Sequence, residues 1–312
     1  MPGKALGIDI GGSKLLVGIV DETGRVLCRR KRAFHDPDRQ QVTTAILEES
    51  RAVLDDPCWK EDPAEEVQAI GVSIPGLADS EKGLWVYAPF SKIADLDMRG
   101  LLQDAFGKPV FLDNDGNVCA VGEKRFGCAK DAGDFLWITV SNGVGAGLML
   151  NGRLYDGVFK GAGELGHVKV AENGVTCPCG AKGCLEAYAA GPAISRRYQE
   201  KTGGQTRLTA LEIAELARRN DAAALDVFRE EGFYLGKAIA SAVTLLNLPL
   251  AVIGGGVSGS FDLFAPALRK TLQEQMFLPA NKNFRVLPTA LGYEASLIGA
   301  GALAFYGLEG QN

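Results

Sequence analysis

One short pattern occurs twice in this sequence: an apolar strand, a turn that contains glycine, and a second apolar strand. Residues 8–12 and residues 138–142 carry the pattern at an offset of 130 positions. Apolar runs that stop at glycine are typical of buried strands joined by a tight turn. The repetition predicts two similar halves, each of which begins with a β-hairpin.

The rest of the chain alternates between strand-like and helix-like segments. Strands are predicted over residues 6–10, 15–20, 26–33, 67–74, 109–112, 136–140, 146–150 and 250–253. Helices are predicted over residues 38–54, 117–126, 211–219, 222–246 and 294–306, with Asn117 as the N-cap of the second. Such alternation is typical of the α/β class.

The length of the chain favours two domains, because a domain usually has about 100–200 residues and this chain has 312. We place a small domain at residues 1–116 plus 293–312. A large domain, with a cysteine-rich loop and a dimer surface, is placed at residues 117–292.

Composition excludes several classes of protein. The net charge of −5 and the pI of about 5.3 disfavour a nucleic-acid partner. The sequence has no apolar run of about 18 residues and no signal peptide at its start. We therefore expect a cytoplasmic protein with neither a membrane nor a nucleic acid as its partner.

Three of the seven cysteines lie close together, and a histidine precedes them. His167, Cys177, Cys179 and Cys184 are the ligand types of tetrahedral Zn²⁺. Four protein ligands leave no open position, so the metal would be structural. The alternative is a group of buried cysteines without a metal. The other four, Cys28, Cys58, Cys119 and Cys128, are scattered singly along the sequence.

Two carboxylates, Glu164 and Glu186, bracket this loop. Carboxylate oxygens accept hydrogen bonds from sugar hydroxyls. His167 has two ring nitrogens, so one would bind zinc while the other donates to a substrate. The alternative is that both glutamates are ordinary surface residues.

Asp115 follows a predicted strand and precedes a predicted helix, the position where α/β sheets bind ligands. A carboxylate there would act as a general base toward a hydroxyl. The alternative is an aspartate that only shapes a turn or caps a helix.

The glycine-containing turns at residues 9–14 and 141–145 could present backbone amides to phosphates, or be plain hairpin turns. Neither the P-loop motif nor the dinucleotide fingerprint is present.

Together these residues resemble the ROK family of repressors, open reading frames and kinases, and the resemblance covers the whole chain. The matching motifs are Asp9-x-Gly11-Gly12-Ser13-Lys14, Asn114-Asp115-x-Asn117, Glu164-x-Gly166-His167 and Cys177-x-Cys179-Gly180-x-x-Gly183-Cys184-x-Glu186. The resemblance implies a two-domain actin-like ATPase fold of the hexokinase type, similar to ribonuclease H. It also implies a homodimer.

The resemblance also implies a role for each matching residue. Asp115 would be the general base, and Asp9 would hold Mg²⁺. The sugar would be bound by Ser73, Pro75, Gly76, Asn114, Asp115, Glu164, His167 and Glu186. ATP would be bound by Asp9, Gly11, Gly12, Ser13, Lys14, Ser141, Asn142, Gly143, Gly254, Gly255 and Gly256. Structural Zn²⁺ would be bound by His167, Cys177, Cys179 and Cys184.

The sequence departs from the family pattern at two places. The second phosphate motif reads Ser-Asn-Gly at residues 141–143, where Gly-Thr-Gly or Ser-Thr-Gly is frequent. Residues 88–91, Ala-Pro-Phe-Ser, lack the Asn-Leu and the later Trp of glucokinase-like members. The loop at 88–91 helps to shape the sugar pocket, so it leaves the choice of sugar open.

The predicted function is an ATP-dependent hexose kinase with a glucose-type substrate. The alternatives are a kinase for fructose, allose, mannose or an N-acetylhexosamine, and a catalytically silent sugar-binding or regulatory protein. A repressor of this family needs an N-terminal helix-turn-helix. Because Asp9 opens the phosphate motif so early, we expect no such domain.

Overall fold

The computed structural model describes residues 3–60, 66–88, 93–204 and 207–310. Contacts within the chain define two units. Unit 1 comprises Met1–Asp131, Asp156–Ala162 and Tyr293–Asn312, and unit 2 comprises Ala132–Tyr155 and Gly163–Gly292. The first predicted domain ends at residue 116, whereas unit 1 continues to Asp131 and so includes the whole of the helix at Asp115–Phe126. The division into a small and a large domain stays a prediction.

Unit 1 is built on a five-stranded sheet with the order β3-β2-β1-β4-β8. Its strands are β1 (Lys4–Ile10), β2 (Lys14–Asp21), β3 (Val26–Ala33), β4 (Ala69–Ile74) and β8 (Val110–Asn114). A small second sheet contains β5 (Leu77–Asp79), β6 (Leu84–Tyr87) and β7 (Ala94–Asp97). The helices are α1 (Arg39–Asp55), the 3-10 turn η1 (Pro57–Trp59), α2 (Met98–Phe106), α3 (Asp115–Phe126) and α10 (Ala295–Glu309).

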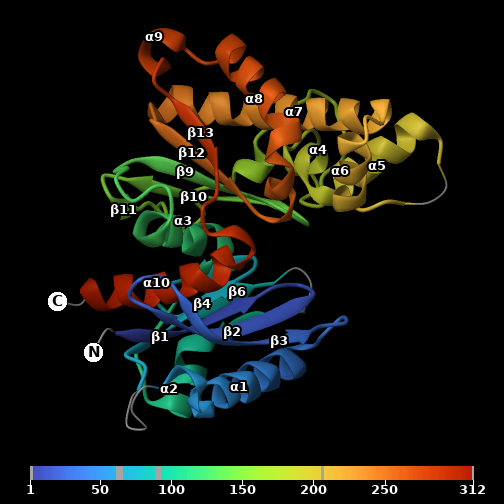
Figure 1. The fold of residues 1–312 in the computed structure, drawn as a ribbon. Helices are drawn as coiled ribbons and strands as arrows, with labels where there is room; N and C mark the ends of the chain where they lie inside the picture. Colours follow the sequence, from blue (N-terminus) through green and yellow to red (C-terminus); the bar gives the residue numbers. More distant parts are fainter. Residues whose placement is uncertain (1–2, 61–65, 89–92, 205–206, 311–312) are drawn as a thin grey trace. The chain divides into compact units, whose positions relative to one another are not determined.

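Helices cover both faces of the main sheet of unit 1. Figure 1 shows α1 and α2 on one face and α10 on the other. The backbone of α10 lies very close to the sheet, because a Cβ at Gly71 would stand 1.8 Å from the Ala300 carbonyl oxygen. A Cβ at Gly7 would stand 2.8 Å from the Leu297 carbonyl oxygen. Glycine at the centres of β1 and β4 therefore lets the helix pack against the strands.

Unit 2 is also built on a five-stranded sheet, with the order β11-β10-β9-β12-β13. Its strands are β9 (Phe135–Val140), β10 (Val144–Leu150), β11 (Arg153–Leu154), β12 (Leu250–Gly254) and β13 (Arg285–Pro288). Its helices are η2 (Leu165–His167), α4 (Glu186–Ala189), α5 (Gly191–Thr202), α6 (Ala210–Arg218), α7 (Ala222–Leu246), η3 (Gly256–Ser260), α8 (Phe261–Gln275) and α9 (Leu278–Asn281). The 3-10 turn η4 (Gly292–Glu294) precedes α10.

The two main sheets have the same topology. In each, three strands pair in antiparallel fashion, and two further strands continue the sheet in parallel. The strands β1 and β9, which carry the repeated sequence pattern, are the third in each order. The predicted pair of similar halves is confirmed at the level of sheet topology.

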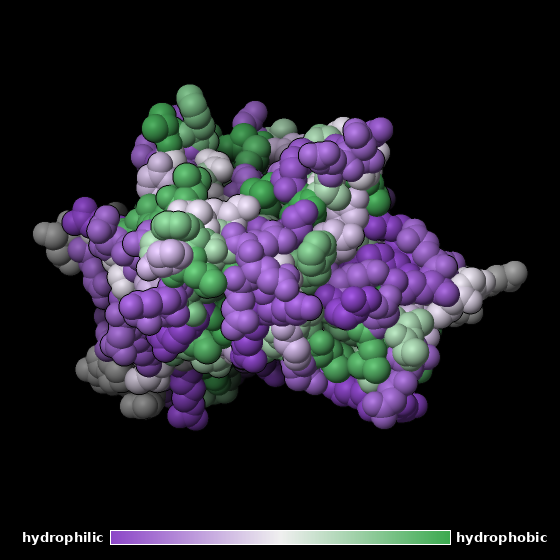
Figure 2. All heavy atoms as spheres, turned by 90° about the horizontal axis from the view of Figure 1, so that it is seen from above, coloured by the Kyte–Doolittle hydropathy of each residue, from purple (hydrophilic) through white to green (hydrophobic). Residues whose placement is uncertain are grey.

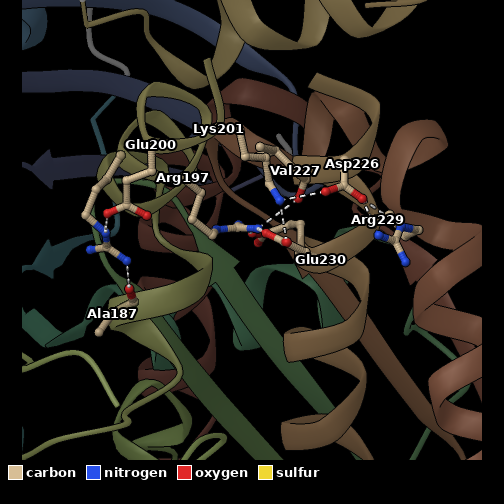
Figure 3. A network of polar contacts seen from close by, with 10 residues as sticks. Ala187, Arg197, Glu200, Lys201, Asp226, Val227, Arg229 and Glu230 are labelled. Carbon is tan, nitrogen blue, oxygen red and sulfur yellow. Dashed lines mark hydrogen bonds and ion pairs between the residues drawn. The ribbon is translucent and has the colours of Figure 1, made fainter. Parts of the chain in front are cut away.

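A polar network joins α5 to α7 in unit 2 (Figure 3). The Arg197 guanidinium donates to the Glu231 carboxylate at 2.6 Å and to the Val227 carbonyl at 2.8 Å. Lys201 donates to Asp226 at 2.6 Å and to Glu230 at 2.7 Å. Glu231 is fully buried, and Arg197 is its ion-pair partner. The Arg197 charge offsets only part of the cost of burying this carboxylate, because burial still raises the pKa of Glu231 to about 8.

Hydrophobic side chains reach the surface in several separate groups among hydrophilic ones on the face seen in Figure 2. Among the described residues, no helix combines the length and the apolar character needed to cross a bilayer.

Candidate active site

Polar residues gather at the carboxyl edge of the sheet in unit 1. Asp9 pairs in register with Ser73 on the neighbouring strand, and Ser73 pairs with Asp113 on the next. Asn114 ends β8, and Asp115 begins α3 directly after it. The carboxyl edge of parallel strands is where α/β sheets bind ligands.

The start of α3 fixes the position of Asp115. The Asn114 side chain accepts the Asn117 N–H at 2.9 Å, so Asn114 is the N-cap and the predicted cap at Asn117 is wrong. The Asn117 amide instead donates to Asp113 at 2.9 Å, and Asp113 also accepts the Asn114 N–H at 2.7 Å. Asparagine is a frequent N-cap residue, so the sequence alone does not distinguish Asn114 from Asn117. In the structure the Asn117 side chain is bonded to Asp113, and the Asn114 side chain caps the helix.

The electrostatics of this edge are dominated by buried carboxylates. The pKa of the Asp9 carboxyl is raised to about 6, chiefly by burial and also by the negative charge of Asp115, while Lys14 and a hydrogen bond with Ser73 oppose the rise. Burial likewise raises the pKa of Asp113 to about 6. The Lys14 Nζ lies 4.0 Å from Asp9 and 4.2 Å from the centre of the Tyr293 ring. Interacting carboxylates with hard oxygen atoms suit Mg²⁺.

The two predicted phosphate turns have different internal bonding. In unit 1 the Gly11 N–H donates to the Lys14 carbonyl at 2.8 Å, and Gly12 and Ser13 are exposed. In unit 2 the Ser141 N–H donates to the Gly143 carbonyl at 2.9 Å.

Further predicted ligand-binding residues lie beside these turns. In unit 2 Gly254 ends β12 and Gly255 and Gly256 follow it, and a Cβ at Gly255 would stand 2.5 Å from the Val140 carbonyl oxygen. The residues 254–256 therefore pack against the strand that leads into the turn at 141–143. In unit 1 the Pro75 carbonyl accepts the Trp85 indole N–H at 2.9 Å, and Gly76 has a φ of 85°.

The four predicted zinc ligands come together in unit 2. One ligand atom from each of His167, Cys177, Cys179 and Cys184 lies within 4.8 Å of the others. The Cys177 Sγ is 3.9 Å from the His167 Nδ1, and the Cys179 Sγ is 3.7 Å from the Cys184 Sγ. Tetrahedral Zn²⁺ with bonds of about 2.3 Å to sulfur separates two sulfur ligands by about 3.7 Å. The residues therefore fit zinc.

Both predicted glutamates lie beside this cluster. The His167 Nε2 faces the Glu164 Oε2 at 3.7 Å, while its Nδ1 faces the thiols. The Glu186 Oε1 lies 3.8 Å from the Cys177 Sγ, and its Oε2 accepts the Val144 N–H at 3.1 Å. Glu186 therefore connects the cysteine cluster to the end of the turn at 141–143.

A hollow of about 410 Å³ opens beside Glu186 and Asn142. Arg196 and Arg207 also line it. Guanidinium groups bind phosphate well, so this hollow has the chemistry for an anionic ligand. The arginines carry no local sequence signal, because Arg196 lies on α5 and Arg207 in the loop before α6, and only tertiary packing brings them together.

A model of the ROK family matches residues 5–306 of this chain. The chain belongs to the ROK family. A xylose repressor of Bacillus subtilis is 31% identical over 234 residues, which are 75% of this chain and 60% of the repressor. A glucokinase of Thermotoga maritima is 29% identical over 314 residues, which cover 96% of each chain.

The crystal structure of a ROK family glucokinase from Streptomyces griseus in complex with glucose and AMPPNP is similar to this chain. The TM-score is 0.84 and the identity 30%, over 97% of this chain and all of that one. The predicted actin-like ATPase fold is therefore confirmed for this ROK protein.

The structure gathers the predicted residues of the ROK protein in two groups. Asp9, Lys14, Ser73, Asn114 and Asp115 lie in unit 1, whereas the cysteine cluster, its glutamates, the turn at 141–143 and the loop at 254–256 lie in unit 2. Most of the predicted sugar loop at 88–91 lies outside the described residues.

Sequence reasoning missed two further residues of unit 1. Asp113 stood among three turn-forming residues without a visible role, and Tyr293 became apparent only from its contact with Lys14.

Proposed function

We propose that this ROK protein is a sugar kinase that transfers the γ-phosphoryl group of ATP to a hydroxyl of a hexose. A glucose-type hexose is the first substrate to test, and fructose, allose, mannose and N-acetylhexosamines follow. The observation that carries the proposal is the position of Asp115, at the start of α3 and within electrostatic reach of buried Asp9. The glucokinase relatives support the same reaction.

Asp115 is proposed as the general base. Its carboxylate accepts the proton of the attacking sugar hydroxyl as the oxygen bonds to phosphorus. The hydrogen bonds from Asn117 and from the Asn114 N–H to Asp113 hold the junction on which Asp115 stands. Asn114 and the segment with Ser73, Pro75 and Gly76 are proposed to position the sugar.

Asp9 is proposed to hold Mg²⁺, directly or through water. When bound, Mg²⁺ neutralises charge on the phosphates of ATP. Lys14 lies 4.0 Å from Asp9 and supplies a positive charge at the same edge. Backbone amides of residues 11–13 and 141–143 are proposed to face phosphates, and residues 254–256 the adenosine.

The zinc loop is proposed to hold the sugar-binding residues in place. Zn²⁺ on His167 Nδ1 would leave Nε2 directed toward Glu164, so both groups would face a substrate in fixed positions. Glu186 is fixed by its hydrogen bond from Val144. Carboxylates held in this way accept hydroxyl hydrogen bonds. A homodimer remains part of the proposal.

The test is a coupled assay of ADP release with ATP, Mg²⁺ and a panel of hexoses. We expect turnover with at least one hexose and none without sugar. No turnover with any panel member would contradict the kinase assignment. Calorimetry that shows sugar binding without nucleotide binding would instead favour a silent sugar-binding protein.

A second candidate function is a sugar-responsive repressor, which the identity to the xylose repressor favours. The discriminating measurement is fluorescence anisotropy with duplex DNA at physiological salt, because electrostatic binding at low salt is not specific. Sequence-specific binding together with absence of ADP release would replace the kinase proposal by this one.

A further inference from the structure

Three metal-ligating side chains meet in unit 1, in residues to which the proposed reaction gives no role. Cys28 lies on β3, while Asp56 and Cys58 lie at the turn after α1. One ligand atom from each lies within 4.8 Å of the other two. The Cys28 thiol interacts with both the Cys58 thiol and the Asp56 carboxylate. Cys28 and Cys58 were described above as scattered single cysteines, because 29 residues separate them along the chain.

The backbone around these residues is held by local contacts. The pairing of β2 with β3 shifts at Cys28, since Ile19 pairs with Cys28 but Val20 pairs with Val26. A shift of this kind is a β-bulge, which re-aims the adjacent side chain. The position of Cys28 on the edge strand is therefore set by the sheet.

The other two ligands are held by the turn η1. The Asp56 carboxylate accepts the Cys58 N–H at 2.9 Å. The adjacent Trp59 is buried, its indole N–H donates to the Val53 carbonyl at 2.9 Å, and its carbonyl accepts from Lys4 at 3.1 Å. Asp56 and Cys58 are thus presented on an anchored segment, and they need little rearrangement to bind a ligand.

The spacing admits a bound metal. Around a tetrahedral Zn²⁺ two sulfur ligands stand about 3.7 Å apart, and the three ligand atoms here lie within 4.8 Å of one another. Both cysteines are free thiols in the structure. Two thiolates and one carboxylate around a divalent cation carry one net negative charge. Arg30, which is ion-paired with Glu49 at 2.7 Å, also lies within electrostatic reach of Asp56 and Cys28.

We propose that Cys28, Asp56 and Cys58 form a second metal site, for a soft divalent cation such as Zn²⁺. Three protein ligands leave a fourth position for water, so this site exchanges its metal more readily than the cluster of His167 and three cysteines. The bound metal fastens the edge strand β3 to the end of α1.

The test counts metal ions on the full chain. The reduced, chelator-treated protein is titrated with Zn²⁺ and separately with Cd²⁺. Bound metal is measured after gel filtration, and thiolate coordination of Cd²⁺ is followed by its ultraviolet absorption. We expect two ions per chain, one removed by a mild chelator and one retained. Cys28→Ser and Cys58→Ser should each leave one ion, and Asp56→Asn should weaken the labile site about tenfold or more.

Two further variants make the count decisive. Cys128→Ser changes an exposed thiol outside both clusters and should still bind two ions. Cys179→Ser disables the other cluster and should keep the labile ion, whatever happens to sugar binding or turnover. Binding of one ion by the unaltered chain, with none by Cys179→Ser, would overturn the proposal. A Cys28–Cys58 disulfide in protein prepared without reductant, seen as a mass lower by two hydrogens, would also overturn it.

Discussion

The two sheets of this protein share one topology but differ at their carboxyl edges. In unit 1, β1 ends with Asp9, which pairs with Ser73, and the edge continues to Asp113 and Asp115. In unit 2, the residue at the position of Asp9 is Thr139, which pairs with Gly254. One copy of the scaffold therefore presents carboxylates, and the other presents hydroxyl groups and backbone amides.

The same sheet topology therefore presents two different sets of chemical groups at its carboxyl edge. Buried carboxylates with a raised pKa suit a divalent cation and proton transfer, whereas glycine-rich turns suit phosphate oxygens. Unit 2 also buries a carboxylate, Glu231, but pairs it with Arg197 between two helices. We therefore propose a functional role for the buried carboxylates of unit 1 and a structural role for the buried ion pair of unit 2.

The largest effect is expected at Asp115. Asp115→Asn removes the proposed base while keeping size and the start of α3. We predict that kcat falls by about 10⁴-fold, with sugar affinity by calorimetry within about threefold of the original. The matched control is Asp104→Asn on the exposed side of α2, which should keep full activity. A kcat for Asp115→Asn near the original value would refute the base assignment.

Asp9→Asn places a neutral residue in β1 where unit 2 has the neutral Thr139, while Asp113 and Asp115 are kept. We predict a loss of about 10³-fold in kcat/KM for ATP, because an amide binds Mg²⁺ poorly. The buried Asp9 has a folded-state pKa raised to about 6, so its contribution to stability is present at low pH and is lost as pH rises through 6. At pH 8 the variant should therefore be more stable by about 1–3 kcal/mol, as measured by urea unfolding. An Asp9→Asn variant that is less stable at pH 8 and fully active would contradict the proposed functional role of the buried Asp9 carboxylate.

Glu231→Ala tests the structural carboxylate of unit 2. Removing it leaves Arg197 buried without its closest partner, and we predict a loss of about 3 kcal/mol in the free energy of unfolding. Because the hydrogen bonds of Arg197 go to Val227, Glu230 and Glu231 rather than to a residue of the proposed site, kcat should stay within about twofold in protein that remains folded. Glu200→Ala removes an exposed ion pair with Arg196 on α5, the helix that carries Arg197, and should cost less than about 0.5 kcal/mol. If both variants lost the same free energy of unfolding, burial of the Glu231 carboxylate would not explain its contribution to stability.

The smallest effect is the pH dependence of the unaltered protein. The kcat/KM for ATP reports groups of the free enzyme, and Asp9 must be ionised to bind the cation. Since its pKa is raised to about 6, activity should fall as pH drops below 6 and reach about a tenth of the plateau near pH 5. Circular dichroism over the same range separates this loss from unfolding. A flat profile down to pH 4 would contradict a buried, functional Asp9.

Much of the fold could be predicted, because long apolar strands and the repeated hairpins are local signals. The strands around Asp9 and Thr139 and the helix at 222–246 were predicted within a few residues. Helix α8 was not, since Pro266 within it reads as a helix breaker. The short strands β5 to β7 carry too few residues for a periodic signal.

Asp115 was singled out because it follows a predicted strand, and Asp9 because it belongs to a family motif. The structure places both at the carboxyl edge of the sheet in unit 1, and their roles stay predictions. The candidate site was not predictable where a side chain depends on tertiary packing. Buried Asp113 accepts hydrogen bonds from the Asn114 N–H and the Asn117 side-chain amide, and these contacts depend on how β8 and α3 pack. The meeting of Cys28 with Cys58 depends on how η1 packs against β3.

The most direct test of the central claim is a crystal structure with a hexose, Mg²⁺ and a non-hydrolysable ATP analogue. We predict one sugar hydroxyl within about 3 Å of the Asp115 carboxylate and directed at the γ-phosphorus. Glu164 or Glu186 should accept hydrogen bonds from other hydroxyls of the same sugar. A bound hexose that makes no contact with Asp115 would contradict the account.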